Sequence, residues 1–361
     1  MVAKSYGRVF VAMSGGVDSS TAAYLLKKEG YDVSGITMVV GPCEDNASCQ
    51  GCLPPAVEDA RKVARQLGIP HYTCDFRDVF EKNVINYFCR EYLEGRTPNP
   101  CVICNKTIKF QVLLQKALSL GAEYLATGHY VRVSYDEGRG RWLLKRGLDL
   151  SKDQSYVLYN LRQEQLPLLK FPLGVYRKQE VREIAVHAGL PVAEKEESQE
   201  ICFIPGNDYR SFLTERFPKA AQPGIIYDTK GKPVGKHRGV AFYTIGQRHG
   251  LNLALGYPAY VVKLDPVRNA VIVGKREELL SAGLVAGDVN FIAIESLDRP
   301  YPAQVKIRYN SKAVPAVISP AEDGEVRVEF LQPQRAVTPG QAVVFYEDDI
   351  VLGGGIIKSP L

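Results

Sequence analysis

The chain has 361 residues, more than one compact core usually holds, so we expect two or three domains. Its hydrophobic fraction of 45% and charged fraction of 24% are typical of a soluble globular protein. No apolar run reaches the ~18 residues that a membrane-spanning helix needs. The N-terminus lacks the apolar stretch of a signal peptide. These features predict a cytoplasmic protein that does not contact membranes.

The formal net charge of +5 permits nucleic-acid binding without arguing for it. The distribution of charge along the chain is more informative, because the segment from Thr229 to Leu264 contains no Asp or Glu. Its cations are Lys230, Lys232, Lys236, Arg238, Arg248 and Lys263. They indicate either a nucleic-acid-binding face or the solvated face of a β-rich domain.

Strand and helix signals alternate over the first 130 residues. Predicted strands cover 8–13, 32–40, 70–76 and 123–127, and predicted helices cover 19–28, 55–67, 78–93 and 106–120. This βαβα rhythm predicts an α/β fold with a parallel sheet covered by helices on both faces. In such sheets, ligands bind beyond the carboxyl ends of the strands.

The pattern changes in the second half of the chain. After helix signals at 178–188 and 208–217, short strands are predicted at 240–244, 259–264, 271–273, 304–309, 326–330 and 342–346. Short strands separated by turns are typical of small barrels or sandwiches. We therefore expect a catalytic α/β domain at 1–210, a central β-rich domain at 211–284 and a C-terminal β-barrel at 285–361.

A glycine-rich loop, SGGVDS at 14–19, follows the first predicted strand and opens a helix. Its glycines let the backbone approach a ligand, and the helix N-terminus offers free N–H groups to a phosphate. Asp18 suits an anion site only if it faces a cation, which makes it a candidate Mg²⁺ contact. The loop lacks the ending of a Walker loop. It resembles instead the signature of the ATP pyrophosphatases, the PP-loop enzymes of adenine-nucleotide-hydrolase-like fold, which split ATP into AMP and pyrophosphate.

Eight cysteines in a large cytosolic chain do not form a disulfide framework. Cys104 lies at the start of a predicted helix with Lys106 and Lys109 nearby, so we predict a lowered thiol pKa and a nucleophilic thiolate. Cys202 lies far away in the sequence, where a partner that meets Cys104 only in the fold could sit.

The chain also resembles the bacterial tRNA-specific 2-thiouridylases, the MnmA type, over nearly its whole length. The motifs that carry the resemblance, besides the loop, are NPCVICNK at 99–106, ATGHY at 126–130, KDQSY at 152–156, TIGQR at 244–248, KIRY at 306–309, TPGQ at 338–341 and LGGG at 352–355. The resemblance implies ATP-dependent 2-thiolation of the wobble uridine in tRNAs for Lys, Glu and Gln.

The resemblance also assigns roles to single residues. ATP would be held by Ala12, Met13, Ser14, Gly15, Gly16, Val17, Asp18, Ser19, Met38 and Gly128. The target base would contact Asn99, Pro100 and Cys101. The remaining tRNA contacts would be His129, Lys152, Asp153, Gln154, Arg308, Tyr309 and Gln341, although Arg308 and Tyr309 also suit a plain strand end.

The implied chemistry begins with adenylation of the uridine oxygen, which turns it into a leaving group. A cysteine desulfurase or a relay protein would then supply a persulfide sulfur, carried by Cys202. Cys104, as the nucleophile, either assists release of that sulfur or attacks first, and a Cys104–Cys202 disulfide remains. The uridine must leave the anticodon stack to reach the site. We expect the enzyme to act as a monomer.

Cys101 stands where the family pattern has an Asp, three residues before the nucleophile. One alternative is therefore an iron–sulfur cluster held by Cys101, Cys104 and Cys202, with one open iron. The other is that Cys101 is a local replacement. The spacing of Cys43, Cys49 and Cys52 is loose for zinc and offers no fourth ligand, so it indicates a flexible loop near the ATP pocket.

Two other functions compete with sulfur transfer. A small-molecule ATP-dependent ligase would use the same loop, but it leaves the basic β half unexplained. An RNA-binding or metal-sensing protein that has lost ATP use is the second, and the intact loop at 14–19 argues against it.

Overall fold

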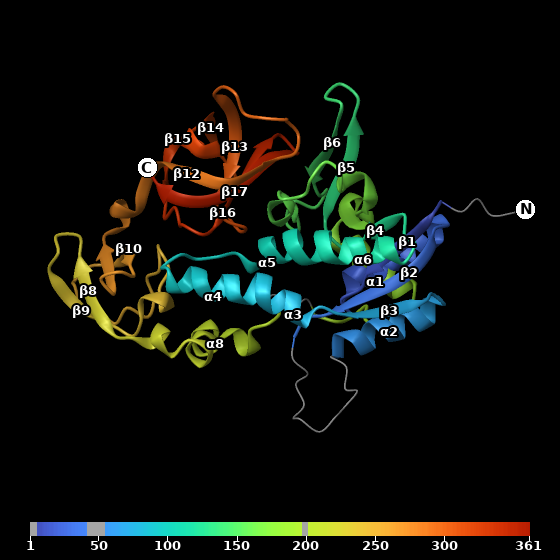
Figure 1. Ribbon diagram of the computed structural model, residues 1–361, viewed down its shortest axis with the longest axis horizontal. Coiled ribbons are helices and arrows are strands. Elements are labelled where there is room, and N and C mark those ends of the chain that lie inside the picture. Colours follow the sequence, from blue (N-terminus) through green and yellow to red (C-terminus); the bar gives the residue numbers. More distant parts are fainter. Residues whose placement is uncertain (1–5, 42–54, 197–200) are drawn as a thin grey trace, which may run out of the picture. The chain divides into compact units, whose positions relative to one another are not determined.

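The computed structural model describes residues 6–41, 55–196 and 201–361. These residues form two compact units, each described by itself (Figure 1). Unit 1 comprises Met1–Asn83, Cys101–Phe203 and Asp349–Val351. Unit 2 comprises Val84–Pro100, Ile204–Asp348 and Leu352–Leu361. No helix in the described part of the chain is long and apolar enough to cross a membrane.

Unit 1 is built on a parallel sheet, as the sequence predicts. Its described strands lie in the order β3-β2-β1-β4-β7. They are β1 (Arg8–Ala12), β2 (Asp32–Val39), β3 (His71–Asp75), β4 (Tyr124–Ala126) and β7 (Leu169–Lys170). Because the strand order reverses direction at β1, the carboxyl ends of β1 and β4 lie at the switch point where α/β proteins bind ligands.

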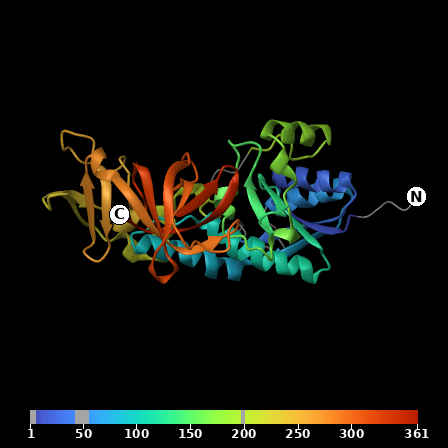
Figure 2. The same cartoon turned by 90° about the horizontal axis from the view of Figure 1, so that it is seen from above.

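Helices cover both faces of this sheet (Figure 2). On one face, α1 (Val17–Glu29), α2 (Pro55–Leu67) and α7 (Lys178–His187) share one apolar core with Val9 and Val11 of β1. On the other lie η2 (Cys104–Leu113) and α6 (Leu114–Ser119). The remaining elements of unit 1 are α3 (Arg77–Phe80), α5 (Pro100–Ile103), β5 (Val131–Asp136), β6 (Arg141–Arg146), η3 (Ser155–Leu158), η4 (Leu166–Leu168) and η5 (Pro172–Val175).

Two of the predicted helices are not continuous α-helices. The segment predicted at 78–93 contains a π-helix, η1 (Glu81–Ile85), between α3 and α4 (Asn86–Leu93). The segment predicted at 106–120 begins earlier, and η2 is π-helical from Cys104 to Leu113. Apolar periodicity cannot separate the two forms, because a π-turn adds one residue to an otherwise helical pattern. π-helical turns are rare and are frequent at functional sites.

Unit 2 carries the β-rich half, which confirms the predicted all-β domains. Strands β8 (Gly224–Asp228), β9 (Pro233–His237), β10 (Tyr260–Asp265) and β11 (Ala270–Gly274) form a sheet in the order β10-β11-β8-β9. The later strands are β12 (Leu280–Phe291), β13 (Tyr301–Lys306), β14 (Val314–Pro320), β15 (Val326–Arg335), β16 (Ala342–Glu347) and β17 (Ile350–Pro360). Pairing of β12 with both β15 and β17 closes them into a barrel, which leaves no open edge.

Short helical elements complete unit 2. They are α4, α8 (Tyr209–Arg216), η6 (Pro205–Asn207), η7 (Pro218–Ala221), η8 (Val240–Phe242), η9 (Arg276–Leu279) and η10 (Glu322–Gly324). The strand predicted at 240–244 is wrong, since η8 is a 3₁₀ turn with three buried apolar side chains. A short apolar run does not distinguish a buried strand from a buried turn. Strand β12 runs without a break across residues 284 and 285.

Candidate active site

The predicted phosphate loop connects β1 to α1. Gly15 has φ +68°, and a Cβ at this position would come within 2.4 Å of the carbonyl oxygen of Ala56. Only glycine meets both demands, the left-handed backbone and the close approach. Gly16 then caps α1 in an extended conformation. The shape of the loop therefore follows directly from its two glycines.

Hydroxyl groups inside the loop hold that shape. The Oγ of Ser19 accepts a hydrogen bond from the backbone N–H of Ser14 at 3.1 Å and donates one to the carbonyl oxygen of Gly16 at 3.2 Å. Ser20 donates to the same carbonyl at 2.8 Å. Ser19 is buried, whereas Ser14 is exposed. Ser19 therefore holds the loop from inside, and Ser14 is open to a ligand.

The carboxyl ends of neighbouring strands lie next to the loop. A Cβ on Gly128, which follows β4, would come within 2.7 Å of the backbone nitrogen of Ser19. Met38 lies near the end of β2, half-buried, and pairs in register with Cys74 of β3. The structure thus brings residues 12–19 and Gly128 to one place, with Met38 at the same edge of the sheet.

Two lysines contact this loop, and sequence reasoning missed both as site residues. The Nζ of Lys178, the first residue of α7, lies 2.7 and 2.9 Å from the two carboxylate oxygens of Asp18. The hydroxyl of Tyr130 donates to the same carboxylate at 2.8 Å. Lys195 donates from Nζ to the carbonyl oxygen of Gly15 at 3.1 Å. Both lysines follow the loop by more than 150 residues, so no local pattern connects them to it.

This geometry bears on the predicted Mg²⁺ contact. The cation that Asp18 faces is the Lys178 ammonium, which is 8% exposed and engages both carboxylate oxygens. Mg²⁺ is usually held by one or two carboxylates together with substrate phosphates. A single carboxylate beside a phosphate loop fits that chemistry, provided that Lys178 moves off Asp18 when the metal arrives.

The structure brings the three predicted thiols into one cluster within unit 1. Cys101 belongs to α5, Cys104 begins η2, and Cys202 follows α7 by fifteen residues of chain. The charges of Cys101 and Cys202 each act on Cys104, and the charge of Cys101 acts on Cys202. Cys101 and Cys202 keep contact with solvent, and Cys104 is half-buried.

The predicted lowering of the thiol pKa is wrong. Burial raises the pKa of Cys104 to about 12 and also raises the pKa of Cys101 and of Cys202. The cause is loss of hydration, which disfavours a thiolate more than the nearby cation favours it. The predicted helix start at Cys104 is also wrong, because α5 (Pro100–Ile103) leads directly into η2 through a helical Ile103. The sequence does not show how many protein atoms surround the sulfur.

Lys109 is the cation that acts on the cluster. Its charge partly offsets the rise in the pKa of all three thiols that burial causes, and it acts on His129 as well. In η2 the backbone bonds join residues five apart, so Lys109 lies one π-helical turn beyond Cys104. In an α-helix the neighbours of Cys104 on that face would instead be residues 107 and 108. Among the residues that the structure describes, no carboxylate is paired with Lys109.

His129, on which the charge of Lys109 also acts, is uncharged. It is buried, and burial holds its pKa well below the ordinary value for histidine. Its Nδ1 shares a hydrogen bond with the hydroxyl of Thr127 at 2.6 Å. Its ring lies 5.8 Å from that of Phe110 and 6.3 Å from that of Phe171, measured between ring centroids. A buried, neutral imidazole is better suited to packing against these rings than to binding a phosphate, because it carries no positive charge.

The iron–sulfur alternative stays a prediction. Among the described residues, no three His, Cys, Asp or Glu side chains are placed so that they hold a metal ion, and that set includes Cys101, Cys104 and Cys202. The cluster of thiols is close enough for electrostatic interaction but is not a preformed ligand set. Cys43, Cys49 and Cys52 lie outside the described residues.

Several predicted tRNA contacts of unit 1 hold its own turns together. The carboxylate of Asp153 accepts hydrogen bonds from the backbone N–H of Gly147 at 3.2 Å and from the hydroxyl of Ser155 at 2.8 Å. The Oε1 of Gln154 accepts from the backbone N–H of Tyr130 at 3.0 Å. Lys152, the residue before Asp153, is half-buried. The structure thus gives Asp153 and Gln154 a clear role in shaping the segment.

Gln341 has a similar internal role in unit 2. Its Nε2 donates to the carbonyl oxygen of Thr97 at 2.7 Å, and the N–H of Thr97 donates to the carbonyl oxygen of Pro339 at 2.9 Å. Gly340 has φ +88°, and a Cβ there would lie 3.0 Å from the backbone nitrogen of Thr97. The turn at 338–341 therefore fixes Thr97, which lies two residues before Asn99.

The other predicted contacts are distributed over both units. Arg308 donates to the carbonyl oxygens of Arg335 and Ala336, whereas Tyr309 is 37% exposed. Asn99 is half-buried and Pro100 is buried, and both belong to unit 2. Cys101, which follows them directly in the chain, belongs to unit 1.

Family models cover most of the chain. A model described as the tRNA methyl transferase HUP domain matches residues 7–206, which is more than half of the sequence. A tRNA methyl transferase PRC-barrel domain matches 210–275, and an aminomethyltransferase beta-barrel domain matches 281–357.

Curated relatives extend the match to almost every residue. A tRNA-specific 2-thiouridylase MnmA from Acetivibrio thermocellus is 53% identical over 355 residues, covering 97% of this chain and 99% of that protein. The MnmA of Heliobacterium modesticaldum is 55% identical over 357 residues, covering 98% and 93%. The chain belongs to the tRNA-specific 2-thiouridylase family.

Among solved structures, the U34-tRNA thiolase NcsA from Methanococcus maripaludis with its [4Fe-4S] cluster is 20% identical. It covers 60% of this chain and 67% of that one, with a TM-score of 0.36. A likeness of that size carries no argument about the cofactor of this member of the thiouridylase family.

Proposed function

We propose that this chain is an ATP-dependent sulfurtransferase that converts the wobble uridine of tRNAs for Lys, Glu and Gln into 2-thiouridine. The observation that carries the proposal is the presence, in one unit, of a PP loop and a cluster of three interacting thiols. Membership of the thiouridylase family supports it, with relatives at 53–55% identity over nearly the full length.

The first step is adenylation of the uridine O2 by ATP. The N–H groups of the loop and the N-terminus of α1 bind the phosphates, and Ser14 adds an exposed hydroxyl. The uridine oxygen attacks the α-phosphorus, the α–β bond breaks, and pyrophosphate leaves. Lys178 and Lys195 place two ammonium groups at the loop, where the negative charge of the leaving group develops. Mg²⁺ held by Asp18 and the phosphates would supply further charge neutralisation.

The second step is sulfur transfer from a persulfide on Cys202, delivered by a cysteine desulfurase or a relay protein. The terminal sulfur attacks C2 of the uridine, and AMP leaves with the oxygen. The Cys104 thiolate then attacks the Sγ of Cys202, which breaks the sulfur–sulfur bond and releases 2-thiouridine. If Cys104 attacks the persulfide first, hydrosulfide is released and attacks C2 instead. Both orders leave a Cys104–Cys202 disulfide, which an external thiol must reduce before the next turnover.

The raised pKa of Cys104 sets a condition on this step. At neutral pH the free enzyme holds Cys104 as a thiol, so the proton must leave before attack. Lys109, one π-helical turn away, stabilises the thiolate once it forms. An inert resting thiol protects the nucleophile until the substrate and the persulfide are present.

Substitution of the cysteines tests the proposal. Cys104→Ser and Cys202→Ser should each abolish 2-thiouridine formation with a persulfide donor, while ATP binding by the full chain is unchanged. Cys101→Ser is the matched control and should keep activity, because no step uses that thiol. Full activity in either of the first two variants would contradict the assigned roles.

We also propose the domain division and setting that the sequence predicts. A catalytic domain at 1–210 is followed by two β domains, and the family models, which end at 206 and 275 and resume at 210 and 281, support separations near those positions. We also propose that the protein acts as a monomer in the cytoplasm, where its tRNA substrate is found.

A further inference from the structure

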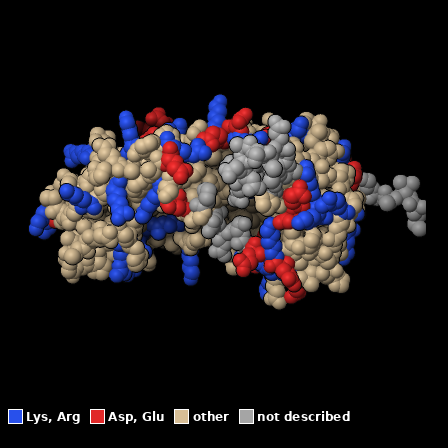
Figure 3. Space-filling model, turned by 90° about the horizontal axis from the view of Figure 1, so that it is seen from below, with Lys and Arg blue, Asp and Glu red and all other residues tan. Residues whose placement is uncertain are grey.

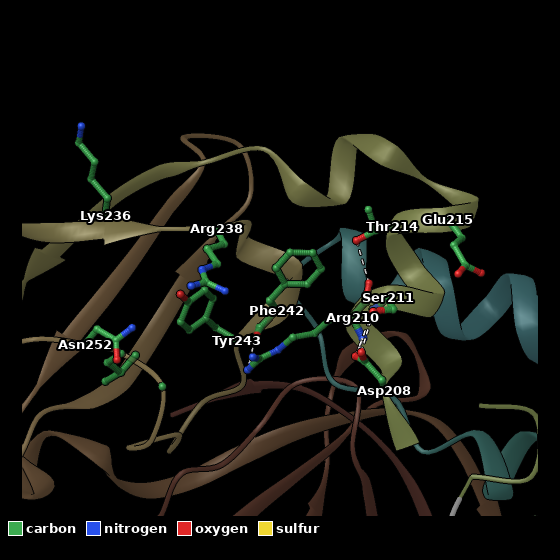
Figure 4. Close-up of a pocket in the computed structure, with 12 residues that line it drawn as sticks. Asp208, Arg210, Ser211, Thr214, Glu215, Lys236, Arg238, Phe242, Tyr243 and Asn252 are labelled. Atoms are coloured by element: carbon green, nitrogen blue, oxygen red, sulfur yellow. Dashed lines mark hydrogen bonds between the residues drawn. The ribbon is translucent and has the colours of Figure 1, made fainter. Parts of the chain in front are cut away.

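Unit 2 contains a cavity that none of the steps above uses. Its volume is about 690 Å³. It lies between α8, the end of β9, the turn η8 and the segment 250–252 (Figure 4). Among the side chains that line it, six carry positive charge or hydrogen-bonding groups relevant to an anion: Arg210, Ser211, Lys236, Arg238, Tyr243 and Asn252. Three of these six are basic, although they come from separate parts of the sequence.

Within the described part of the chain, two of the three cations of this cavity, Lys236 and Arg238, lack the ion-pair partners that other cations of unit 2 have. Lys236 and Arg238 are exposed, and neither forms an ion pair with any residue that the structure describes. By contrast, Arg268 is paired with Asp265 and Arg327 with Glu329. Exposed cations without a carboxylate partner are available to an external anion.

Of the two carboxylates of the lining, Asp208 interacts with the charge of Arg210, which helps to lower the pKa of Asp208. Asp208 caps α8 and accepts hydrogen bonds from the N–H of Arg210 and from the N–H and the hydroxyl of Ser211. These bonds hold its pKa below the ordinary value, so it stays charged and occupied. Glu215 is the other acid of the lining and lies on the last turn of α8. In Figure 4, Lys236 is drawn at the opposite end of the view from Glu215, and Arg238 lies between them beside Tyr243.

Two aromatic residues of the cavity lining are packed into the protein. Phe242 and Tyr243 are 7% and 6% exposed, so their rings are buried and are not free platforms for stacking bases. The guanidinium of Arg210 reaches from α8 to the carbonyl oxygen of Phe242 at 3.3 Å, as Figure 4 shows. The hydroxyl of Tyr209 donates to the same carbonyl at 2.9 Å. This arrangement favours recognition of phosphates over recognition of bases.

We propose that this cavity binds backbone phosphates of the tRNA substrate through Arg210, Lys236 and Arg238. The inference rests on the proposed function for the identity of the RNA. Lys and Arg dominate the charged groups over β8, β9 and β10 of unit 2 in Figure 3. The acid-free segment from Thr229 to Leu264 supplies most of that charge. Such contacts position an RNA and carry no sequence information.

The test measures binding of an unmodified tRNA for Lys to the full chain at several salt concentrations. The variant Lys236→Gln/Arg238→Gln removes two exposed cations without disturbing a packed group. The matched control, Arg268→Gln/Arg327→Gln, removes two exposed but paired cations of the same unit. Each lost phosphate contact should reduce the slope of log K against log [salt] by about 1, so the first variant should lose about 2 units of slope.

At moderate salt, this variant should bind tRNA about tenfold more weakly than the wild type, with kcat unchanged at saturating tRNA. The control should keep the wild-type slope and affinity. Equal slopes and affinities in the two variants would overturn the proposal. If even the wild type forms no 2-thiouridine, the proposed function fails, but the difference in slope still decides whether the cavity binds RNA phosphates.

Discussion

The phosphate loop and the thiol cluster belong to the same unit, yet they differ in what determines their chemistry. At the loop, the backbone determines the chemistry, because two glycines and the start of a helix shape the proposed anion site. At the cluster, the surroundings of the sulfur determine the chemistry, because burial raises the pKa of Cys104 although the charge of Lys109 acts to lower it. A site formed by local backbone can be predicted from a short sequence motif. The reactivity of a buried side chain cannot, because it depends on residues that are distant in the sequence.

The two regions should therefore respond separately to substitution. Each has a lysine that provides positive charge, Lys178 at the loop and Lys109 at the cluster. If the two steps of the reaction are as distinct as their sites, each lysine should affect one step and leave the other unchanged.

Lys178→Met should lower the rate of AMP formation by about 10²- to 10³-fold, because it removes a charge at the position where pyrophosphate departs. The measurement is AMP release with tRNA and a persulfide donor. Lys116→Met, which removes an exposed cation of α6, serves as control and should have no effect. The alkylation rate of Cys104 should stay at the wild-type value in both. A loss of Cys104 reactivity in Lys178→Met would show that the two regions are one site.

Alkylation of Cys104 by iodoacetamide should be about 10²-fold slower at pH 7 than alkylation of the same cysteine in a peptide of residues 99–109. A raised pKa means that the thiol form predominates, and the higher nucleophilicity of the thiolate offsets only part of that loss. The rate in the protein should rise through pH 7 to 10 without a plateau, while the peptide levels off near its ordinary pKa. Peptide-resolved mass spectrometry measures both, and a plateau near pH 8 in the protein would contradict the buried thiol.

Lys109→Met should slow sulfur transfer about tenfold and slow Cys104 alkylation further, because the cation that favours the thiolate is gone. AMP formation should not change. Lys109→Arg should restore most of the activity, and Lys106→Met, an exposed neighbour in the same helix, is the matched control. Equal effects of Lys106→Met and Lys109→Met would mean that the π-helical register does not select Lys109.

Gln341→Ala should have the smallest effect, a few-fold rise in KM for tRNA with little change in kcat. The amide of Gln341 holds the carbonyl of Thr97, which lies two residues before Asn99. The substitution Gln341→Asn keeps the amide but shortens its reach, and it should behave like the alanine variant. A large loss of tRNA affinity with an unchanged melting temperature would favour direct contact of Gln341 with tRNA.

The sequence predicts the framework of this molecule well. The βαβα rhythm, the loop at 14–19 and the β-rich second half all depend on local signals, and the structure contains each of them. The strand predicted at 240–244 fails because its apolar side chains are buried in a turn. The π-helix that begins at Cys104 could not be predicted, because the spacing of apolar residues does not distinguish a π-helix from an α-helix.

Among the site residues, too, those that depend on local sequence were predicted and those that depend on the folded chain were not. The loop glycines and Gly128 meet as expected at the ends of their strands. Lys178 and Lys195 were missed because only the folded chain brings them to the loop. Asp153 and Gln341 show the opposite case, where a motif residue that suggests RNA contact forms an internal hydrogen bond. Polar residues in a motif therefore need their bonding partners before they are assigned to a ligand.

The proposed mechanism requires that sulfur pass through Cys202 and Cys104. The most direct measurement is a single turnover with ATP, tRNA and enzyme carrying a persulfide, without reductant, followed by mass spectrometry of the protein and the tRNA. The account predicts one Cys104–Cys202 disulfide for each 2-thiouridine formed. Formation of 2-thiouridine with both thiols still reduced would contradict it.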